Sequence, residues 1–398
     1  MGNSPQNQVQ ALEPAKIATV LASVRQSNTF ELTDWQVQSL AKGSLTGNVF
    51  RLSGSGTDDG TPAKWSLILK FLPSPASDQT DAIHQFGDES TRWDYWKREV
   101  HFYQSNLPDS LPSGLTAPQC YHIEEQPDGF WLWLEDIVDI YEHRWPIARF
   151  GLAAEHLGHF NGAYLVGTDI PTYSWLAKDK AWISDWEERI KKADALAKIE
   201  QMRHENPLMR RGWPDDIAVS FTRFWQERAR FYEVLDSLPK TLQHADCSHK
   251  NLMARRDKDG KGETVALDWA LLGIGTLGEE IARLVFSTLT HAGVPMTQAS
   301  ELETVVLEGY MRGLQDVGWD GDPKLIRLGY LASMVLAFGF FVTLTPEFIV
   351  LANEDNAKRL EAMYELPLET VIDNRVKLRR FIAARADEAL VTMVASDL

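Results

Sequence analysis

The stretch that decides the fold is Leu242-Gln-His-Ala-Asp-Cys-Ser-His-Lys-Asn-Leu252, followed by a short β-like run that ends in an acid, Val265-Ala-Leu-Asp-Trp269. Phosphoryl transfer uses these residue types, because one carboxylate holds the attacking hydroxyl while an asparagine and another aspartate hold Mg²⁺ on the phosphates. We therefore predict that Asp246 is catalytic and that Asn251 and Asp268 bind Mg²⁺, a hard cation that prefers oxygen ligands. Taken singly, each of the three could be a turn residue or a strand cap. Their combination at this spacing favours the catalytic interpretation.

The composition excludes several classes of protein. The chain has 398 residues, 44% of them hydrophobic, and a formal net charge of −16. It is therefore long enough for two or three lobes and too apolar for wholesale disorder. So acidic a surface argues against broad binding of nucleic acid.

Three further features indicate the compartment. Cys120 and Cys247 are the only cysteines, too few for a disulfide framework or a zinc cluster. The N-terminal stretch lacks the basic and apolar regions of a secretion signal. The apolar run Leu328–Leu344 is slightly short for a bilayer and indicates a buried helix. We expect a cytoplasmic protein that has no membrane partner.

The pattern of the chain changes near Asp136. Residues 1 to 13 are polar and are expected to be frayed, and helical spacing follows up to residue 34. From Trp35 three β-like runs separated by turn residues are followed by a helix that includes Trp93 and Tyr103, and then by a hairpin. Beyond Asp136 the pattern is mostly helical, with two short β-like pieces between 241 and 270. These patterns predict an α+β chain with a tail and helix (1–34), an N-lobe (35–136) and a helical C-lobe (137–398).

The catalytic loop (242–252) and the metal-binding segment (265–282) resemble those of the aminoglycoside phosphotransferase family, which is related to choline kinases and more distantly to protein kinases. The sequences HADCSHKNLM and ALDWALLGIGTLGEEIA carry this resemblance, and the segments ILKFL, KREVHFY, LWLED and AAEHLGHFNGAYL agree with it. The resemblance extends over residues 35 to 290. It implies a bilobal protein-kinase-like fold: a five-stranded antiparallel N-lobe with one helix, a larger helical C-lobe, and ATP in the cleft between them.

Two departures from the family pattern concern the substrate. Ser248 stands two residues after the catalytic aspartate, where the family commonly has histidine, so the usual cation is missing or displaced to His249. Glu280 replaces a later aspartate, and Gly275-Thr-Leu replaces the frequent Gly-Asp-Pro. Neither departure removes a metal ligand.

Lys70 and Glu99 are the expected pair that positions the phosphates. Lys70 ends the apolar run WSLIL, and a cation in such a strand must snorkel or pair with an anion. The resemblance assigns it to the phosphates. Glu99 shares a helix face with Trp96 and Tyr103, so it is the expected partner. The alternative is that Glu99 pairs with its neighbours Arg98 or Lys97 in solvent.

Two loops complete the expected nucleotide site. Gly43-Ser44-Leu-Thr-Gly47 lies between two strands, and its glycines let backbone amides approach phosphate, although an ordinary hairpin turn has the same composition. The segment around Glu135 and Ile137 is the expected hinge beside adenine, although Glu135 and Asp136 could instead be solvated linker charges. His244 is expected to be structural.

The predicted function is ATP- and Mg²⁺-dependent phosphorylation of a hydroxyl group on a small molecule, such as an antibiotic, a sugar, an amino alcohol or a natural product. GTP remains an alternative to ATP, and the oligomeric state is open. A protein-kinase-like enzyme is disfavoured because no Ala-Pro-Glu segment follows Asp268. A nucleotide-binding pseudokinase is disfavoured because the catalytic residues are intact. Carboxylates in 170–225 and 320–355, among them Asp185, Glu187, Glu347 and Asp355, would favour a polar acceptor if they face the cleft and an apolar one if they do not.

Overall fold

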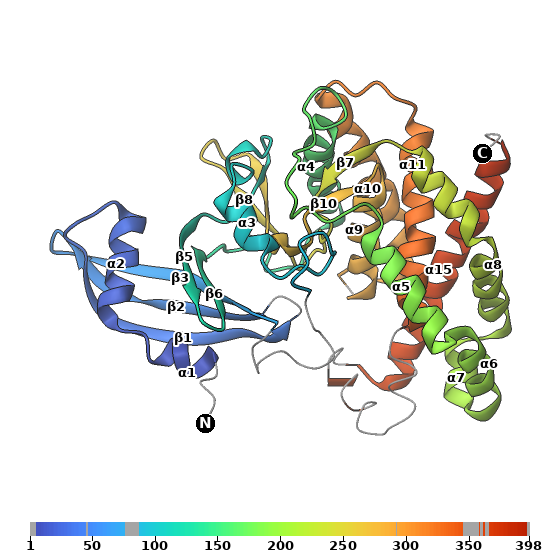
Figure 1. Cartoon of the computed structure of the whole chain (residues 1–398), viewed down its shortest axis with the longest axis horizontal. Coiled ribbons are helices and arrows are strands. Elements are labelled where there is room, and N and C mark those ends of the chain that lie inside the picture. Colours follow the sequence, from blue (N-terminus) through green and yellow to red (C-terminus); the bar gives the residue numbers. More distant parts are fainter. Residues whose placement is uncertain are drawn as a thin grey trace.

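The computed structural model describes residues 5–44, 47–75, 87–291, 293–344, 358, 361–362 and 366–395. A sheet-rich N-terminal part and a larger helical C-terminal part lie side by side, with α3 and β8 between them (Figure 1). The predicted α+β, bilobal fold is confirmed.

One five-stranded antiparallel sheet forms the N-lobe. Its spatial order is β1-β2-β3-β6-β5. Its strands are β1 (Glu31–Ser44), β2 (Gly47–Asp58), β3 (Thr61–Pro73), β5 (Cys120–Gln126) and β6 (Gly129–Glu135). The predicted sequence of three strands, a helix and two strands is confirmed, and β1 begins ahead of residue 35. The division into domains at residues 34 and 136 stays a prediction.

Both faces of the central strands β3 and β6 are covered, which explains why these two strands are nearly continuously apolar. In β3 the alternate residues Leu67, Leu69 and Phe71 pack with the helices α1 (Pro5–Gln10) and α2 (Pro14–Arg25). The expectation that residues 1–13 are frayed is wrong for the described part, because Val9 in α1 is fully buried in this cluster. One apolar side chain in a polar segment was too weak a signal to predict that contact.

The opposite face of the sheet packs on α3 (Arg98–Gln104). This helix is shorter than expected, because Trp93 lies before it. The buried guanidinium of Arg98 donates to the carbonyl oxygens of Trp93 (2.7 Å), Ala270 (2.8 Å) and Trp175 (2.7 Å). These bonds hold the preceding chain in a non-helical turn and tie α3 to the C-terminal part.

Helices dominate the rest of the chain. They are α4 (Ile147–Ala163), α5 (Ala181–Ala193), α6 (Ala195–Glu205), α7 (Pro207–Gly212), α8 (Asp215–Ser237), α9 (Glu279–Thr290), α10 (Ala299–Asp316), α11 (Pro323–Ser333), α12 (Phe340–Leu344) and α15 (Leu368–Ala395), with a π-helical turn at Met334–Gly339 and 3₁₀ turns at Pro108–Ser110, Trp269–Leu271 and Met296–Gln298. The continuous helical stretch 323–343 is long and apolar enough to cross a membrane, but 83% of its most apolar window is buried inside the protein. The prediction of a buried helix is confirmed.

Short strands carry the predicted catalytic segments. They are β4 (Leu115–Thr116), β7 (Lys240–Gln243), β8 (Leu252–Arg256), β9 (Gly262–Ala266) and β10 (Gly273–Thr276). β7 pairs with β10, and β9 lies between β4 and β8. The sequence predicted only two β-like pieces in this region. The extra strands are too short for their periodicity to be recognised.

Candidate active site

A cavity of about 660 Å³ lies between the two lobes, a size typical of small-molecule sites. Six of the predicted site residues line it: Lys70, Glu99, Glu135, Ile137, Asn251 and Asp268. Apolar side chains from both lobes form its walls, among them Val49, Ile68, Met253 and Leu267. The fold therefore brings residues almost 200 positions apart, such as Lys70 and Asp268, into contact in one cavity.

Lys70 joins two carboxylates. Because side chains alternate along β3, Lys70 points to the face of the sheet on which α3 packs. Its Nζ lies 2.5 Å from Glu99 Oε2 and 3.1 Å from Asp268 Oδ1. The predicted Lys70–Glu99 pair is confirmed, and the rival pairing fails because the Arg98 guanidinium bonds to carbonyl oxygens instead.

Burial and charge oppose each other in this group. Burial disfavours the charged ammonium, but the carboxylates of Asp268 and Glu99 outweigh it and raise the pKa of Lys70 above its ordinary value. Burial also raises the pKa of Glu99, and Lys70 counteracts that rise. The Lys70 ammonium and the Glu99 carboxylate therefore stabilise each other, because either charge buried here without the other is strongly disfavoured.

The predicted catalytic loop leaves β7 through a left-handed residue, Ala245, at φ +62°. His244 holds this turn as predicted. Its Nδ1 accepts the backbone N–H of Asp246 (3.1 Å), and its Nε2 lies 2.9 Å from the carbonyl oxygen of Leu267. Burial lowers the pKa of His244 to about 4, so the ring is neutral at physiological pH and can play this donor and acceptor role.

The buried carboxylate of Glu280 holds the loop that follows β7. Its Oε1 accepts the backbone N–H of Ala245 (2.9 Å), and its Oε2 accepts the side-chain amide of Asn161 in α4 (2.8 Å). Asn161 also donates to the carbonyl oxygen of Leu242 at 2.9 Å. Burial raises the pKa of Glu280 to about 7 in spite of these donors. The longer side chain that replaces the family's aspartate thus still reaches the loop.

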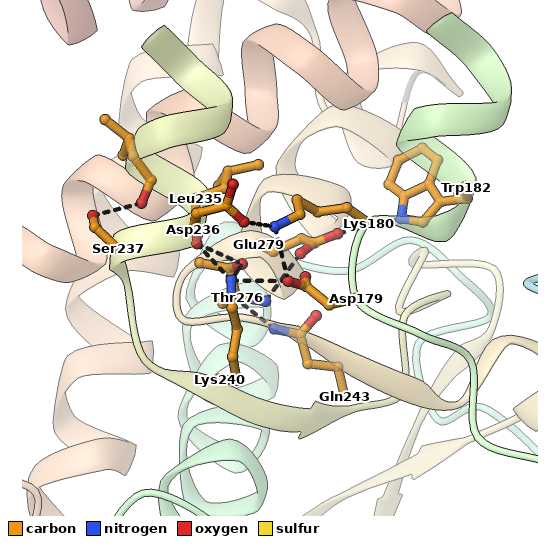
Figure 2. Close-up of polar contacts among 11 residues, drawn as sticks. Asp179, Lys180, Trp182, Leu235, Asp236, Ser237, Lys240, Gln243, Thr276 and Glu279 are labelled. Atoms are coloured by element: carbon orange, nitrogen blue, oxygen red, sulfur yellow. Dashed lines mark hydrogen bonds and ion pairs between the residues drawn. The ribbon is translucent and has the colours of Figure 1, made fainter. Parts of the chain in front are cut away.

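A second polar cluster fixes the start of α9 (Figure 2). Lys240 in β7 donates to Thr276 Oγ1 in β10 (2.8 Å) and lies 3.0 Å from Asp179 Oδ2. Glu279 accepts the backbone N–H of Thr276 (3.0 Å) and the indole N–H of Trp182 (3.2 Å). The cluster joins β7, which leads to Asp246, to the helix that carries the residue facing it.

That facing residue is Arg283, in the second turn of α9. Its Nη2 and Nε lie 2.7 and 3.1 Å from Asp246 Oδ1, while Asn251 donates its side-chain amide to Asp246 Oδ2 at 2.9 Å. Burial raises the pKa of Asp246, and Arg283 opposes that rise. Sequence reasoning missed this arginine. The sequence signal for Arg283 was its position one turn after the acidic start of a helix. Many solvent-exposed arginines have the same position, so this signal does not identify a site residue.

The cation usual at the position of Ser248 is missing there, as one expected alternative has it, and it is not displaced to His249. His249 lines the cavity between the lobes, and the described partners of the Asp246 carboxylate are Arg283 and Asn251 instead. Burial lowers the pKa of His249 to about 4, so it carries no charge at neutral pH. The positive charge beside Asp246 comes from α9, because the long side chain of Arg283 reaches the Asp246 carboxylate.

The two predicted loops differ in how far the structure describes them. Gly43 and Ser44 end β1 and Gly47 begins β2, so they form a tight hairpin, while residues 45 and 46 lie outside the described part. In the predicted hinge, Glu135 pairs with Arg255 (2.8 Å) and Asp136 with Arg51 (2.7 Å). The alternative of solvated linker charges is therefore wrong for both carboxylates.

Asp139, which the sequence did not single out, anchors the chain just after the hinge. Its carboxylate accepts the backbone N–H groups of Tyr141 and His143 and the indole N–H of Trp145, each at 3.0 Å. An aspartate among polar linker residues carries no signal that distinguishes this role.

The carboxylates expected beside the acceptor are paired within the protein. Asp185 binds Arg189 at 2.8 Å, and Glu187 binds Arg228 at 2.8 Å. Glu347 and Asp355 lie outside the described residues. Aromatic side chains from the same region pack together instead: Trp182 on Phe338, Trp186 on Phe341, and Phe286 on both phenylalanines.

A five-stranded lobe and a helical lobe enclose a Lys–Glu pair, an Asp–Asn loop and a second aspartate, and this architecture is a protein-kinase-like fold. Residues 143–319 match the model of the phosphotransferase enzyme family named APH, which confirms the resemblance inferred from the motifs. A search of curated proteins found no match.

Three solved structures are similar to this chain, and the first of them, with a TM-score above 0.5, supports the fold. An aminoglycoside phosphotransferase from Alicyclobacillus acidocaldarius is similar at 11% identity and a TM-score of 0.52, with 92% of this chain and 95% of that chain covered. A choline kinase from Cryptosporidium parvum has 12% identity and a TM-score of 0.49, with 90% of each chain covered. A spectinomycin phosphotransferase, solved with ADP and spectinomycin, has 12% identity and a TM-score of 0.48, with 94% of this chain and 100% of that chain covered.

Proposed function

We propose that this protein transfers the γ-phosphoryl group of ATP to a hydroxyl group of a small molecule, with Mg²⁺ as cofactor. The observation that carries the proposal is a connected set of polar groups: Lys70, Glu99, Asn251 and Asp268 line the 660 Å³ cavity, and Asp246 adjoins it through Asn251. Lys70 is bonded to Glu99 and Asp268, and Asn251 is bonded to Asp246. These are the groups needed to hold a triphosphate, a metal and an attacking hydroxyl.

The residues that line the cavity suit a nucleotide. Val49 and Ile68 from the N-lobe and Met253 and Leu267 from the C-lobe offer apolar walls for a purine ring. The backbone of 135–137 would bind the edge of that ring, and Lys70, oriented by Glu99, would contact phosphate oxygens. The hairpin at Gly43, Ser44 and Gly47 would cover the phosphates.

Asn251 and Asp268 fit a magnesium site by the chemistry of their donor atoms. Because the amide nitrogen of Asn251 is bonded to Asp246, its oxygen is the atom it can offer to a cation, and Asp268 adds a carboxylate. Both are the hard oxygen ligands that Mg²⁺ prefers. A magnesium ion bound there would neutralise charge on the phosphate oxygens.

Asp246 has the role of orienting the acceptor. Its carboxylate would accept a hydrogen bond from the acceptor hydroxyl and take up the proton as the new O–P bond forms. The transition state of phosphoryl transfer is loose, so positioning and charge supply most of the rate enhancement. Because Arg283 stands beside Asp246 and the nearby carboxylates are paired, we expect a neutral hydroxyl compound to be favoured over an amine.

The test is a phosphotransfer assay with ATP or GTP, Mg²⁺ and panels of sugars, neutral alcohols, amino alcohols and aminoglycosides, with product identified by mass. Asp246→Asn should lower kcat on the order of 1,000-fold and leave nucleotide affinity nearly unchanged. The exposed Asp169, changed to Asn, is the matched control and should behave as wild type.

Three outcomes would contradict the proposal. Tight nucleotide binding without transfer to any acceptor would indicate a pseudokinase. Transfer to peptides alone would indicate a protein-kinase-like enzyme. Loss of nucleotide binding in Asp246→Asn would show that this residue belongs to the triphosphate site.

A further inference from the structure

The two oxygens of the Asp246 carboxylate accept different numbers of hydrogen bonds. Oδ1 accepts two hydrogen bonds from Arg283, at 2.7 and 3.1 Å, and Oδ2 accepts one from Asn251 at 2.9 Å. A carboxylate offers about four acceptor positions, two on each oxygen. Among the residues that the structure describes, these are the donors to the carboxylate, so the position left for a further donor is on Oδ2.

Arg283 is itself held in place. Its guanidinium lies over the ring of Trp182, 5.3 Å from the centroid, and 6.0 Å from that of Phe338. The indole N–H of Trp182 is bonded to Glu279, which lies one turn earlier on the same helix. Phe338 stacks on Phe286, also in α9, at 4.4 Å. An arginine packed in this way is pre-organised, so it loses little side-chain freedom when it orients another group.

We propose that Arg283 is the positioning residue of the reaction: it occupies Oδ1 of Asp246 and so directs the acceptor hydroxyl to Oδ2. This inference rests on the proposed function. It assigns to α9 a role that neither the motif in 242–252 nor the metal-binding pair accounts for.

The step can be written for this geometry. The acceptor hydroxyl donates to Oδ2, the oxygen shared with Asn251. As the acceptor oxygen forms its bond to the γ-phosphorus, the bond from that phosphorus to the β,γ-bridging oxygen breaks. The hydroxyl proton passes to Oδ2, and the bridging electrons leave with ADP. Because Asn251 is bonded to the same oxygen, the hydroxyl is held on the side of the carboxylate nearest the predicted metal ligands.

Among the described residues, Arg283 is the one cation bonded to the Asp246 carboxylate. Lys70 is engaged by Glu99 and Asp268, and His249 lies in the nucleotide cavity. If Arg283 were removed, the Asp246 carboxylate could rotate about its side-chain bonds, and either oxygen could meet the acceptor. A misplacement of about 1 Å costs on the order of 100-fold in rate.

The experiment compares Arg283→Met and Arg283→Lys with wild type, with Asp246→Asn, and with the double variant Arg283→Met/Asp246→Asn. Arg312→Gln is the matched control, since Arg312 makes the same kind of bond to Glu155 (3.0 Å) on an exposed surface. Nucleotide affinity, kcat and acceptor KM are measured for each variant, together with urea unfolding.

We expect Arg283→Met to lower kcat on the order of 100-fold with nucleotide affinity unchanged. Arg283→Lys should lose less, because an ammonium keeps the charge but cannot give two bonds from a rigid fork. In the Asp246→Asn background, Arg283→Met should cause no further loss of kcat, because both changes remove one function.

Two results would overturn the inference while leaving the proposed function standing: wild-type kcat in Arg283→Met, or an additive loss in the double variant. An additive loss accompanied by weaker folding would show that Arg283 only stabilises α9. If wild type itself transferred phosphate to nothing, the proposed function would fail, and the role of Arg283 with it.

Discussion

Replacing Lys70 by methionine should expose the energetics of the site most directly. The change removes the cation between two carboxylates whose side chains are only 1% (Glu99) and 18% (Asp268) exposed. Breaking a buried ion pair by removing one partner costs about 3–5 kcal/mol, because the remaining charge is left without compensation. We expect Lys70→Met to lower the free energy of unfolding by this amount and also to weaken nucleotide binding.

Replacing Glu99 should destabilise the protein less than replacing Lys70. Glu99→Gln leaves Lys70 its contact with Asp268 and keeps an acceptor oxygen, so it should cost only about 1 kcal/mol. The double variant Lys70→Met/Glu99→Gln should be more stable than Lys70→Met alone, because it no longer buries the Glu99 charge.

The pH dependence of stability tests independently whether the deficit of Lys70→Met comes from the buried charge of Glu99. Burial raises the pKa of Glu99, and without Lys70 this pKa rises further. A carboxyl whose pKa is raised by folding contributes stability that is complete below its unfolded pKa and is lost as the pH rises through its folded pKa. The deficit of Lys70→Met relative to wild type should therefore shrink between about pH 8 and about pH 5.

Urea unfolding followed by tryptophan fluorescence measures all three variants, because the chain has 14 tryptophans. A deficit in Lys70→Met that does not change with pH would refute the reasoning. A double variant as unstable as the sum of the two single variants would refute it as well.

Three other predictions concern the metal, acid stability and helix packing. Asp268→Ala should abolish the Mg²⁺ dependence of nucleotide affinity, and a normal Mg²⁺ titration in this variant would leave the residue a structural role only. Burial lowers the pKa of His156 to about 3, so this neutral ring contributes stability above pH 6.5 that is lost as the pH falls. Between about pH 6.5 and about pH 4.5, His156→Gln should therefore lose about 2–3 kcal/mol less of its free energy of unfolding than wild type, as measured by urea unfolding at these two pH values. Gly309→Ala should destabilise by about 1–3 kcal/mol despite alanine's helix propensity, because its Cβ would meet the Gly151 carbonyl oxygen at 2.0 Å; an unchanged urea midpoint would contradict the packing of α4 against α10.

Much of the fold and the site could be inferred from local pattern. Alternation in the β-like runs predicted the N-lobe sheet, because period-two burial depends on the strand alone. The spacing of Asp246 and Asn251 predicted that both belong to one site, and a short loop does bring them into contact. The apolar flanks of Lys70 and the inner-face position of Glu99 predicted their pairing, because a buried cation requires an anion.

Other features depend on how distant segments pack. Arg283 meets Asp246 across a separation of 37 residues, and that contact depends on the rotation of α9, which the polar cluster around Glu279 sets. Arg98 bonds to backbone carbonyls, which every residue has, so no sequence pattern could single out its partners. Val9 is buried only because α1 lies on the sheet. Residue types and short spacings encode which chemistry is available, whereas the orientation of one helix against a loop is a sum over many weak contacts, and only the folded chain determines it.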